Sequence, residues 1–227
     1  MFAGVALPVF TACFLCLVVT VLIWFLLRKK RSSVLILGIC DSGKTTLFAQ
    51  LHHGATMPTH TSLKENIGKF ETEKENLTLI DVPGHEKVRY ECFGKFKCDT
   101  RASLFVIDSK NIQTELKDVA EFMYNVLTDP EIVSCRPKVL VVCNKQDCTS
   151  AKGSVVVRSL LEKELNTLML TRTGALAGLD QTSKSVQVTL AKPGTVFTFS
   201  TSRLPIEFAE CSALSDVSPI KIWLKSV

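Results

Sequence analysis

The chain has 227 residues, 22% of them charged, and a formal net charge of +5. The cluster at 28–31, Arg-Lys-Lys-Arg, supplies +4 of that charge, so residues 32–227 carry only +1. Nothing in this balance suggests a nucleic-acid-binding surface, and no direct nucleic-acid partner is expected. About 195 residues follow the cluster, a length that suits one α/β domain with a sizeable core.

The N-terminal segment is apolar enough to predict a transmembrane helix. Residues 1–27 contain no charged side chain, and at 1.5 Å per residue a helix over 9–27 reaches about 28 Å, close to the roughly 30 Å hydrocarbon core. A cleaved signal peptide is the alternative, but the basic n-region, shorter apolar stretch and small-residue cleavage site are all missing. We expect a short N-terminus at 1–8, a span at 9–27 and a basic juxtamembrane linker at 28–32. The positive-inside rule places the C-terminal part in the cytosol.

Residues 33–227 alternate between apolar strand-like runs and helix-like stretches, which predicts an α/β fold with a mostly parallel, doubly wound sheet and helices on both faces. Residues 171–195, rich in Thr, Ser, Gly and Gln, are expected to be a flexible, solvated insertion before the last strand. Strands are expected at 34–37, 67–71, 77–81, 103–108, 139–144 and 206–211, and helices at 45–52, 115–127, 156–170 and about 220–225.

A phosphate-binding loop of the type G-x-x-x-x-G-K-[ST] follows the first expected strand. Its glycines let backbone N–H groups turn inward around a phosphate, and the following helix points its positive dipole end at the same anion. Lys44 would neutralise the β- and γ-phosphates, and the Thr45 hydroxyl would bind Mg²⁺. We therefore predict that a nucleoside triphosphate binds Gly38, Ile39, Cys40, Asp41, Ser42, Gly43, Lys44, Thr45 and Thr46.

The third expected strand ends in Asp81-Val82-Pro83-Gly84. An Asp-x-Pro-Gly sequence alone is usually just a turn. At a strand end in the same sheet as a phosphate loop, however, Asp81 fits the carboxylate that holds Mg²⁺ through water. The backbone N–H of Gly84 is then available to the γ-phosphate.

The fifth expected strand ends in Asn144-Lys145-Gln146-Asp147, and this motif indicates the base. Guanine presents two adjacent donors, N1–H and N2–H₂, which one carboxylate such as Asp147 can accept, whereas adenine has no such pair. Lys145 would lay its aliphatic stem over the ring, and Asn144 would tie this loop to the phosphate loop. After the last strand, Ser212 and Ala213 would supply backbone N–H groups, notably that of Ala213, to the guanine O6. GTP and Mg²⁺ are therefore the expected ligands.

Together these residues resemble the small GTPase superfamily over nearly all of 33–227. The sequences GICDSGKTTLF, LIDVPGHE, ELKDVAEFMYNVL, VCNKQD and LEKELNTL, with the N-terminal span, are more closely similar to the β subunit family of the signal recognition particle receptor. That resemblance implies an Arf-like GTPase of the endoplasmic reticulum membrane, single-pass, with a lumenal N-terminus and a cytosolic GTPase domain. It implies that the switch surface binds the N-terminal domain of the receptor α subunit. Membrane lipid, the ribosome and the translocon are further candidate partners.

The resemblance also assigns the switch residues. It places the first switch at Thr59, His60, Thr61 and Ser62, where one hydroxyl would cap Mg²⁺; Thr61 is favoured and Ser62 stays a candidate. His85 stands where Ras-like enzymes have a water-positioning glutamine. It is therefore the candidate catalytic residue, and a histidine that simply points out of the loop is the alternative.

Three functions stay open on these grounds. The first is a GTP-gated membrane anchor for the receptor α subunit, with at most slow hydrolysis because no arginine clearly occupies a finger position. The second is an actively cycling Arf-like trafficking GTPase with an accessory activator. The third is a membrane-tethered kinase or ATPase, against which Asp147 argues, since adenine would leave it without donors.

Overall fold

The computed structural model describes residues 14–20, 31–55, 62, 64–72, 76–177, 189–191 and 194–227. The chain divides into two compact units, Met1–Arg31 and Ser32–Val227. In the first unit, residues 14–20 are helical, and the rest of the span expected at 9–27, together with 28–30 of the linker, lies outside the described residues. Across the ranges that are described, no helix has the length and apolar character needed to cross a membrane.

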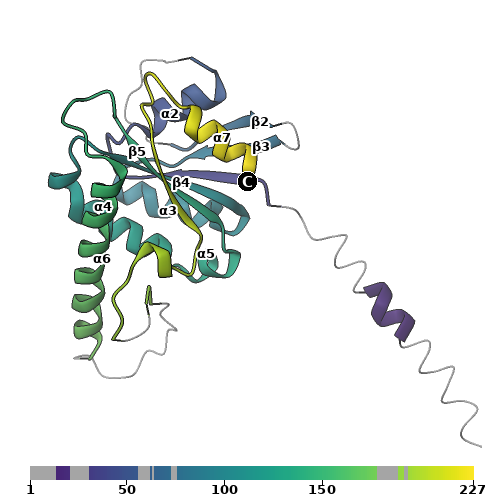
Figure 1. The fold of residues 1–227 in the computed structure, drawn as a ribbon. Helices are drawn as coiled ribbons and strands as arrows, with labels where there is room; N and C mark the ends of the chain where they lie inside the picture. Colours follow the sequence, from purple (N-terminus) through teal and green to yellow (C-terminus); the bar gives the residue numbers. More distant parts are fainter. Residues whose placement is uncertain are drawn as a thin grey trace, which may run out of the picture. The chain divides into compact units, whose positions relative to one another are not determined.

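The second unit is built on a six-stranded sheet in the order β2-β3-β1-β4-β5-β6 (Figure 1). Strand β2 pairs with β3 in antiparallel fashion, and every other neighbouring pair is parallel. The mostly parallel α/β fold predicted from the sequence is thus confirmed. The strands are β1 (Ser33–Leu37), β2 (Asn66–Glu71), β3 (Asn76–Asp81), β4 (Thr100–Asp108), β5 (Lys138–Asn144) and β6 (Ile206–Glu210).

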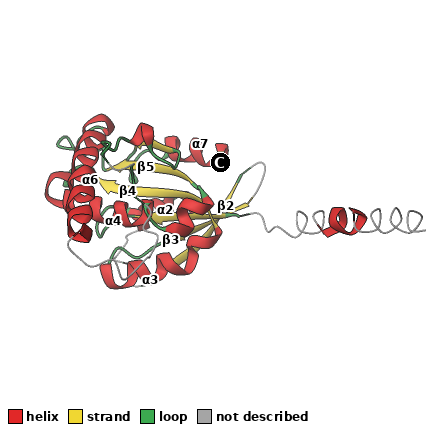
Figure 2. Ribbon diagram, turned by 90° about the horizontal axis from the view of Figure 1, so that it is seen from below, coloured by secondary structure: helices red, strands yellow, loops and turns green. Residues whose placement is uncertain are grey.

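Helices cover both faces of the sheet (Figure 2). All five residues of β1 are buried, and they alternate between two cores because successive side chains of a strand point to opposite faces. Leu35 and Leu37 belong to the core with α3 to α6, whereas Val34 and Ile36 belong to the core with α2 and α7. The helices are α2 (Lys44–His52), α3 (Glu86–Phe96), α4 (Ile112–Leu127), α5 (Pro130–Cys135), α6 (Ser154–Ala177) and α7 (Ser218–Ser226), with short 3₁₀ turns η1 (Lys97–Asp99) and η2 (Phe199–Thr201).

The structure differs from the sequence prediction on one face of the sheet. Helices α3 and α5 were not expected, and α6 continues to Ala177 instead of ending near 170. The first part of the insertion expected at 171–195 is therefore helical, and Leu190 is buried in the core. Residues 178–188 and 192–193 of that insertion lie outside the described residues.

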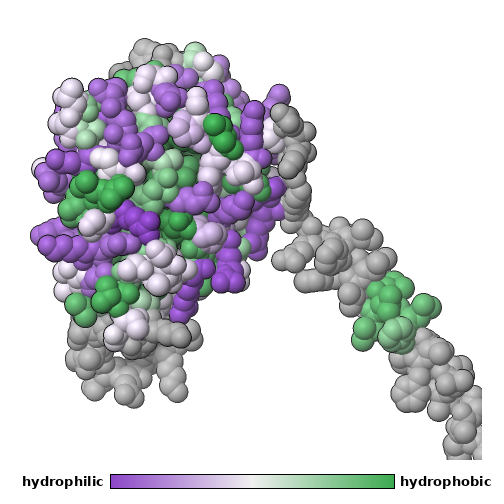
Figure 3. Space-filling model, in the orientation of Figure 1, coloured by the Kyte–Doolittle hydropathy of each residue, from purple (hydrophilic) through white to green (hydrophobic). Residues whose placement is uncertain are grey.

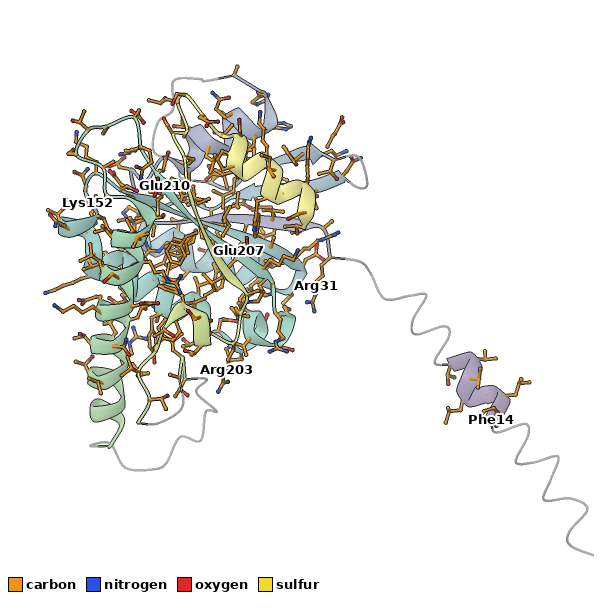
Figure 4. All side chains as sticks on the ribbon, in the orientation of Figure 1. Phe14, Arg31, Lys152, Arg203, Glu207 and Glu210 are labelled. Atoms are coloured by element: carbon orange, nitrogen blue, oxygen red, sulfur yellow. The ribbon has the colours of Figure 1, made fainter. Side chains whose placement is uncertain are left out.

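Because β1, β3, β4, β5 and β6 are parallel, their carboxyl ends lie along one edge of the sheet. Figure 4 shows Glu210, at the end of β6, on the same side of the molecule as Lys152, which precedes α6. The Glu210 carboxylate accepts the Ser154 N–H at 2.6 Å and so joins β6 to the start of α6. Each of the predicted motifs follows one of these strand ends.

Candidate functional site

The loop between β1 and α2 has a backbone that only certain residues can adopt. Gly38, Asp41 and Gly43 have positive φ values of 148°, 58° and 89°. A Cβ atom on Gly38 would lie 2.3 Å from the Val106 carbonyl oxygen, so glycine is required there. The first N–H groups of α2 have no partner inside the helix, and a glycine-rich loop that leads into a helix N-terminus suits an anion.

Lys44 begins α2 and is almost completely buried. Its ammonium group donates to the carbonyl oxygen of Ile39 and lies 3.4 Å from the Ser42 hydroxyl. Burial lowers its pKa to about 8, and the nearby Asp81 carboxylate opposes this shift only partly. Because nearby negative charge offsets the burial of this ammonium group only partly, a bound anion such as a phosphate is favoured here.

Oxygen-bearing side chains gather beside Lys44, where Thr45 donates to Asp81 Oδ2 at 2.9 Å. Asn66, at the start of β2, donates to the same oxygen at 3.0 Å, and the Ser62 hydroxyl lies 3.1 Å from that of Thr45. Burial raises the pKa of Asp81, and the hydrogen bonds from Asn66 and Thr45 oppose it. Thr59, His60 and Thr61 lie outside the described residues.

The free oxygen of Asp81 tests whether this cluster fits a cation. Within the described part of the chain, Asp81 Oδ1 is a buried atom that has no hydrogen-bond partner. A carboxylate oxygen and hydroxyl groups are hard ligands, and they suit Mg²⁺. Asp81, Thr45 and Ser62 therefore fit a magnesium site.

Gly84 follows β3 and lies against the phosphate loop. A Cβ atom there would lie 2.8 Å from the backbone nitrogen of Cys40 and 2.9 Å from Lys44 Nζ. His85 comes next, as the exposed N-cap residue of α3. Arg89, four residues further, is buried, with its guanidinium 4.1 Å from the centre of the Phe122 ring. The sequence interpretation overlooked Arg89 because α3 itself was not expected.

Asn144, at the end of β5, joins two loops of the site. Its amide nitrogen donates to the Ser42 carbonyl at 2.8 Å, as predicted for a link to the phosphate loop, and its oxygen accepts the Ala213 N–H at 2.9 Å. The Ala213 N–H thus donates to Asn144 in this structure. Its expected contact with the guanine O6 stays a prediction. Gly43 has no room for a Cβ atom because Asn144 Nδ2 would lie 2.3 Å away.

Lys145 and Asp147, in the same motif as Asn144, bond to residues that follow two other strands. Lys145, with a positive φ of 66°, forms an ion pair of 2.7 Å with Asp108 at the end of β4. Burial raises the pKa of Asp108, but the bonds from Lys145 and from two backbone N–H groups outweigh it and lower the pKa overall. Ser212 donates to Asp147 at 2.7 Å, and this bond lowers the pKa of Asp147. Asp147 is exposed and ionised, so it can accept hydrogen bonds from a ligand.

The structure thus places the described members of the predicted site along one edge of the sheet. They offer an anion-binding loop, an oxygen cluster that fits Mg²⁺ and an exposed carboxylate that can accept two adjacent donors. Asn66 and Asp108 were not predicted as site residues, although both bond directly to predicted ones. An acidic residue at the end of a buried strand was the available signal for Asp108.

Known proteins resemble this chain over most of its length. The model of the family described as signal recognition particle receptor beta subunit matches residues 29–205. The signal recognition particle receptor subunit beta of Homo sapiens is 41% identical over 227 residues, covering 94% of this chain and 83% of that protein.

Solved structures give the same result. The structure of the mammalian SRP receptor is 41% identical and superposes with a TM-score of 0.74, covering 86% of this chain and 98% of that chain. A Chaetomium thermophilum SRb-GTP/SRX complex shares the fold at 20% identity and a TM-score of 0.64, covering 87% of this chain and 97% of that one.

Proposed function

This chain belongs to the signal recognition particle receptor beta subunit family, and from that premise we propose that it is a membrane-anchored, GTP-binding subunit that holds the receptor α subunit in a GTP-dependent way. The observation that carries the guanine assignment is the exposed Asp147 carboxylate, which Ser212 fixes beside the loop that Asn144 ties to Ser42. The arrangement has an acceptor for paired donors where a base would lie. It also has a cation and a helix N-terminus where phosphates would lie.

Mg²⁺ would be held by Thr45 and by Asp81 through water, with Thr61 or Ser62 completing the set. When bound, the ion would neutralise charge on the β- and γ-phosphates. Lys44 would supply a second positive charge, and Gly84 would present its backbone N–H to the γ-phosphate. These residues account for binding and orientation of the triphosphate.

Hydrolysis is proposed to be slow in the isolated chain. His85 is the candidate that would orient water, but it is exposed at the N-cap of α3. The Arg89 guanidinium is buried against Phe122, so it is not presented from the surface as a finger. Transition-state charge is thus left without a mobile arginine from the α3 turn, and binding matters more than turnover.

The partner and the membrane belong to the same proposal. A Chaetomium thermophilum protein of the same fold is in an SRb-GTP/SRX complex. The N-terminal domain of the α subunit, as the partner of this chain, rests on the receptor family to which the chain belongs. The apolar run at 9–27 and the basic cluster after it support an endoplasmic reticulum anchor, with 32–227 in the cytosol. Figure 3 shows a mixed polar surface with scattered apolar side chains on the face it displays.

Capture of the α subunit tests this function directly. The full chain in vesicles, loaded with a non-hydrolysable GTP analogue, should retain the N-terminal domain of the α subunit, and the GDP-loaded chain should retain much less. Equal retention with both nucleotides would contradict GTP gating.

The membrane orientation has its own test. In microsomes, an added protease should digest residues 32–227. Protection of that fragment would show the opposite orientation.

A further inference from the structure

A cavity of about 340 Å³ lies beside the phosphate loop, between α3 and α4. It borders the loop and the Gly84 turn, so its walls include residues that would surround a γ-phosphate. Its other walls are rich in carboxylates. The charged residues that line it are Asp41, Glu86, Arg89, Glu115, Asp118 and Glu121.

Two atoms of opposite charge on these walls lack partners. Among the buried side-chain atoms of the described residues, Arg89 Nε and Glu115 Oε2 are two that have no hydrogen-bond partner. Buried polar atoms are almost always paired, and an unpaired group costs the full loss of its hydration. Two such atoms with complementary chemistry on one cavity therefore need an explanation.

Arg89 is weakly held in the described structure. It is 7% exposed, and Nη1 lies 3.5 Å from the Gly84 carbonyl oxygen, which is at the limit of a hydrogen bond. The rings of Phe122 and Tyr90 face its guanidinium at 4.1 and 5.2 Å, which contributes attraction but no acceptor. The Gly84 carbonyl thus contacts a buried guanidinium whose Nε–H donor is unused among the described residues.

Glu115 is a partly buried carboxylate with too little positive charge around it. Burial raises its pKa, and Asp108, Asp41 and Asp118 raise it further. Lys145 opposes this shift, but that lysine is already paired with Asp108 at 2.7 Å. A cation brought to Glu115 would therefore relieve both its lost hydration and the repulsion by its neighbours.

We propose that Arg89 and Glu115 pair across this cavity when a triphosphate is bound, which makes Arg89 a positioning residue for the Gly84 turn. The inference rests on the proposed GTP binding. A γ-phosphate that engages the Gly84 N–H shifts the adjoining peptide, whose carbonyl is the weak acceptor of Arg89. The guanidinium then takes Glu115 as its acceptor and fixes α3 to α4, which favours the triphosphate over the diphosphate.

The ratio of the affinities for a non-hydrolysable GTP analogue and for GDP, measured with the full chain in vesicles and Mg²⁺, tests this pair. Glu115→Gln keeps the shape and removes the charge, and it should lower the ratio roughly tenfold, within the usual range of coupling between sites. Arg89→Gln should lower it similarly, and the double variant should add no further loss because the two residues act as a unit. Asp118→Asn, on the same cavity wall, is the charge-matched control. It removes only part of the repulsion on Glu115, so it should change the ratio much less than Glu115→Gln does.

Thermal unfolding of the nucleotide-free chain separates this role from a static structural one. Glu115→Gln should not lower the melting temperature, since Oε2 has no partner to lose in that state. An unchanged ratio in Glu115→Gln, an equal shift in Asp118→Asn, or additive losses in the double variant would overturn the pair. If Arg89→Gln fails to fold, Arg89→Lys replaces it, because lysine keeps the positive charge but lacks the planar guanidinium with its several donors. If the wild-type chain binds neither nucleotide, the proposed function itself fails, and this inference with it.

Discussion

Lys44 is a buried cation whose pKa is near 8, against 10.5 in an unfolded chain. Between these values the unfolded state holds more protons, so this group makes the nucleotide-free fold more stable as the pH rises from about 8 to 10.5. Below pH 8 both states are protonated, and the group adds no pH dependence. Nucleotide affinity should change with pH in the opposite direction, because a phosphate binds the charged form of this lysine.

We expect the affinity for GTP to fall above pH 8, by up to about tenfold per pH unit. Nucleotide titrations from pH 7 to 9.5 would measure this, with Lys44→Met as the control for other titrating groups. If the wild type and Lys44→Met show the same slope, Lys44 does not carry the effect.

Contiguous motifs made much of the site predictable at the level of residues. The phosphate loop, Asp81 and Asn144 each follow an apolar run, so the edge on which they lie could be read from the sequence. Asn66 reaches Asp81 only through the β2–β3 pairing. The bond from the Ala213 N–H to Asn144 depends on side-chain orientation, which no motif specifies.

Among the elements, α3 has one glycine inside it and another just before it, and the surroundings of the two differ sharply. A Cβ atom on Gly84, just before the helix, would lie 2.8 Å from backbone atoms of Cys40. A Cβ atom on Gly94, inside the helix, would meet no described atom within 4 Å outside the helix's own backbone and the adjacent residues. We expect Gly84→Ala to weaken nucleotide binding strongly because the loop must shift. Gly94→Ala should instead stabilise the fold by roughly 0.5–1 kcal/mol, since alanine loses less backbone entropy in a helix.

Chemical denaturation and nucleotide titration of both variants would measure these effects. Gly94→Ala should leave nucleotide affinity unchanged. Tight nucleotide binding by Gly84→Ala would show that this turn does not need to approach the phosphate loop so closely.

Asn166 is one of the α6 side chains that bond to the segment before β6, together with Arg158 and Glu162. The Asn166 amide donates to the Phe197 carbonyl at 2.9 Å and accepts the Phe197 N–H at 2.7 Å. Asn166→Ala leaves both backbone groups unpaired, and it should cost about 2–3 kcal/mol of unfolding free energy. Thr167→Ala, at the next and exposed position, is the control and should cost less than about 1 kcal/mol. Equal costs would show that the bridge contributes no stability.

The strands were predictable because runs of buried residues are continuous, as in β1 and β5. Helix α3 escaped prediction because it buries few side chains, among them the charged Arg89. Helix α5 is a single short segment of six residues that Asp129 caps, too brief to show a period. The polar composition of residues 171–177 predicts an insertion there, whereas the structure continues α6 through them, and this helix packs along α4.

At the scale of the whole molecule, the proposed function combines a cytosolic nucleotide-binding unit with an apolar N-terminal anchor. The nearly neutral charge of 32–227 and the basic cluster at 28–31 are consistent with attachment through the chain's own apolar segment rather than through a basic surface. The nucleotide would then decide whether a membrane-bound chain engages its partner. The nucleotide-dependent part of this function rests on the identity of the base.

Competition among GTP, ATP and XTP for the full chain in vesicles, repeated with Asp147→Asn, is therefore the most direct measurement. The wild type should bind GTP far more tightly than ATP or XTP. Asp147→Asn should lose roughly a hundredfold in GTP affinity, because it loses charge-assisted bonds to N1–H and N2–H₂. It should gain affinity for XTP, whose O2 can accept from the asparagine amide. A wild type that prefers ATP, or a variant with an unchanged preference for GTP, would contradict the guanine assignment and the function built on it.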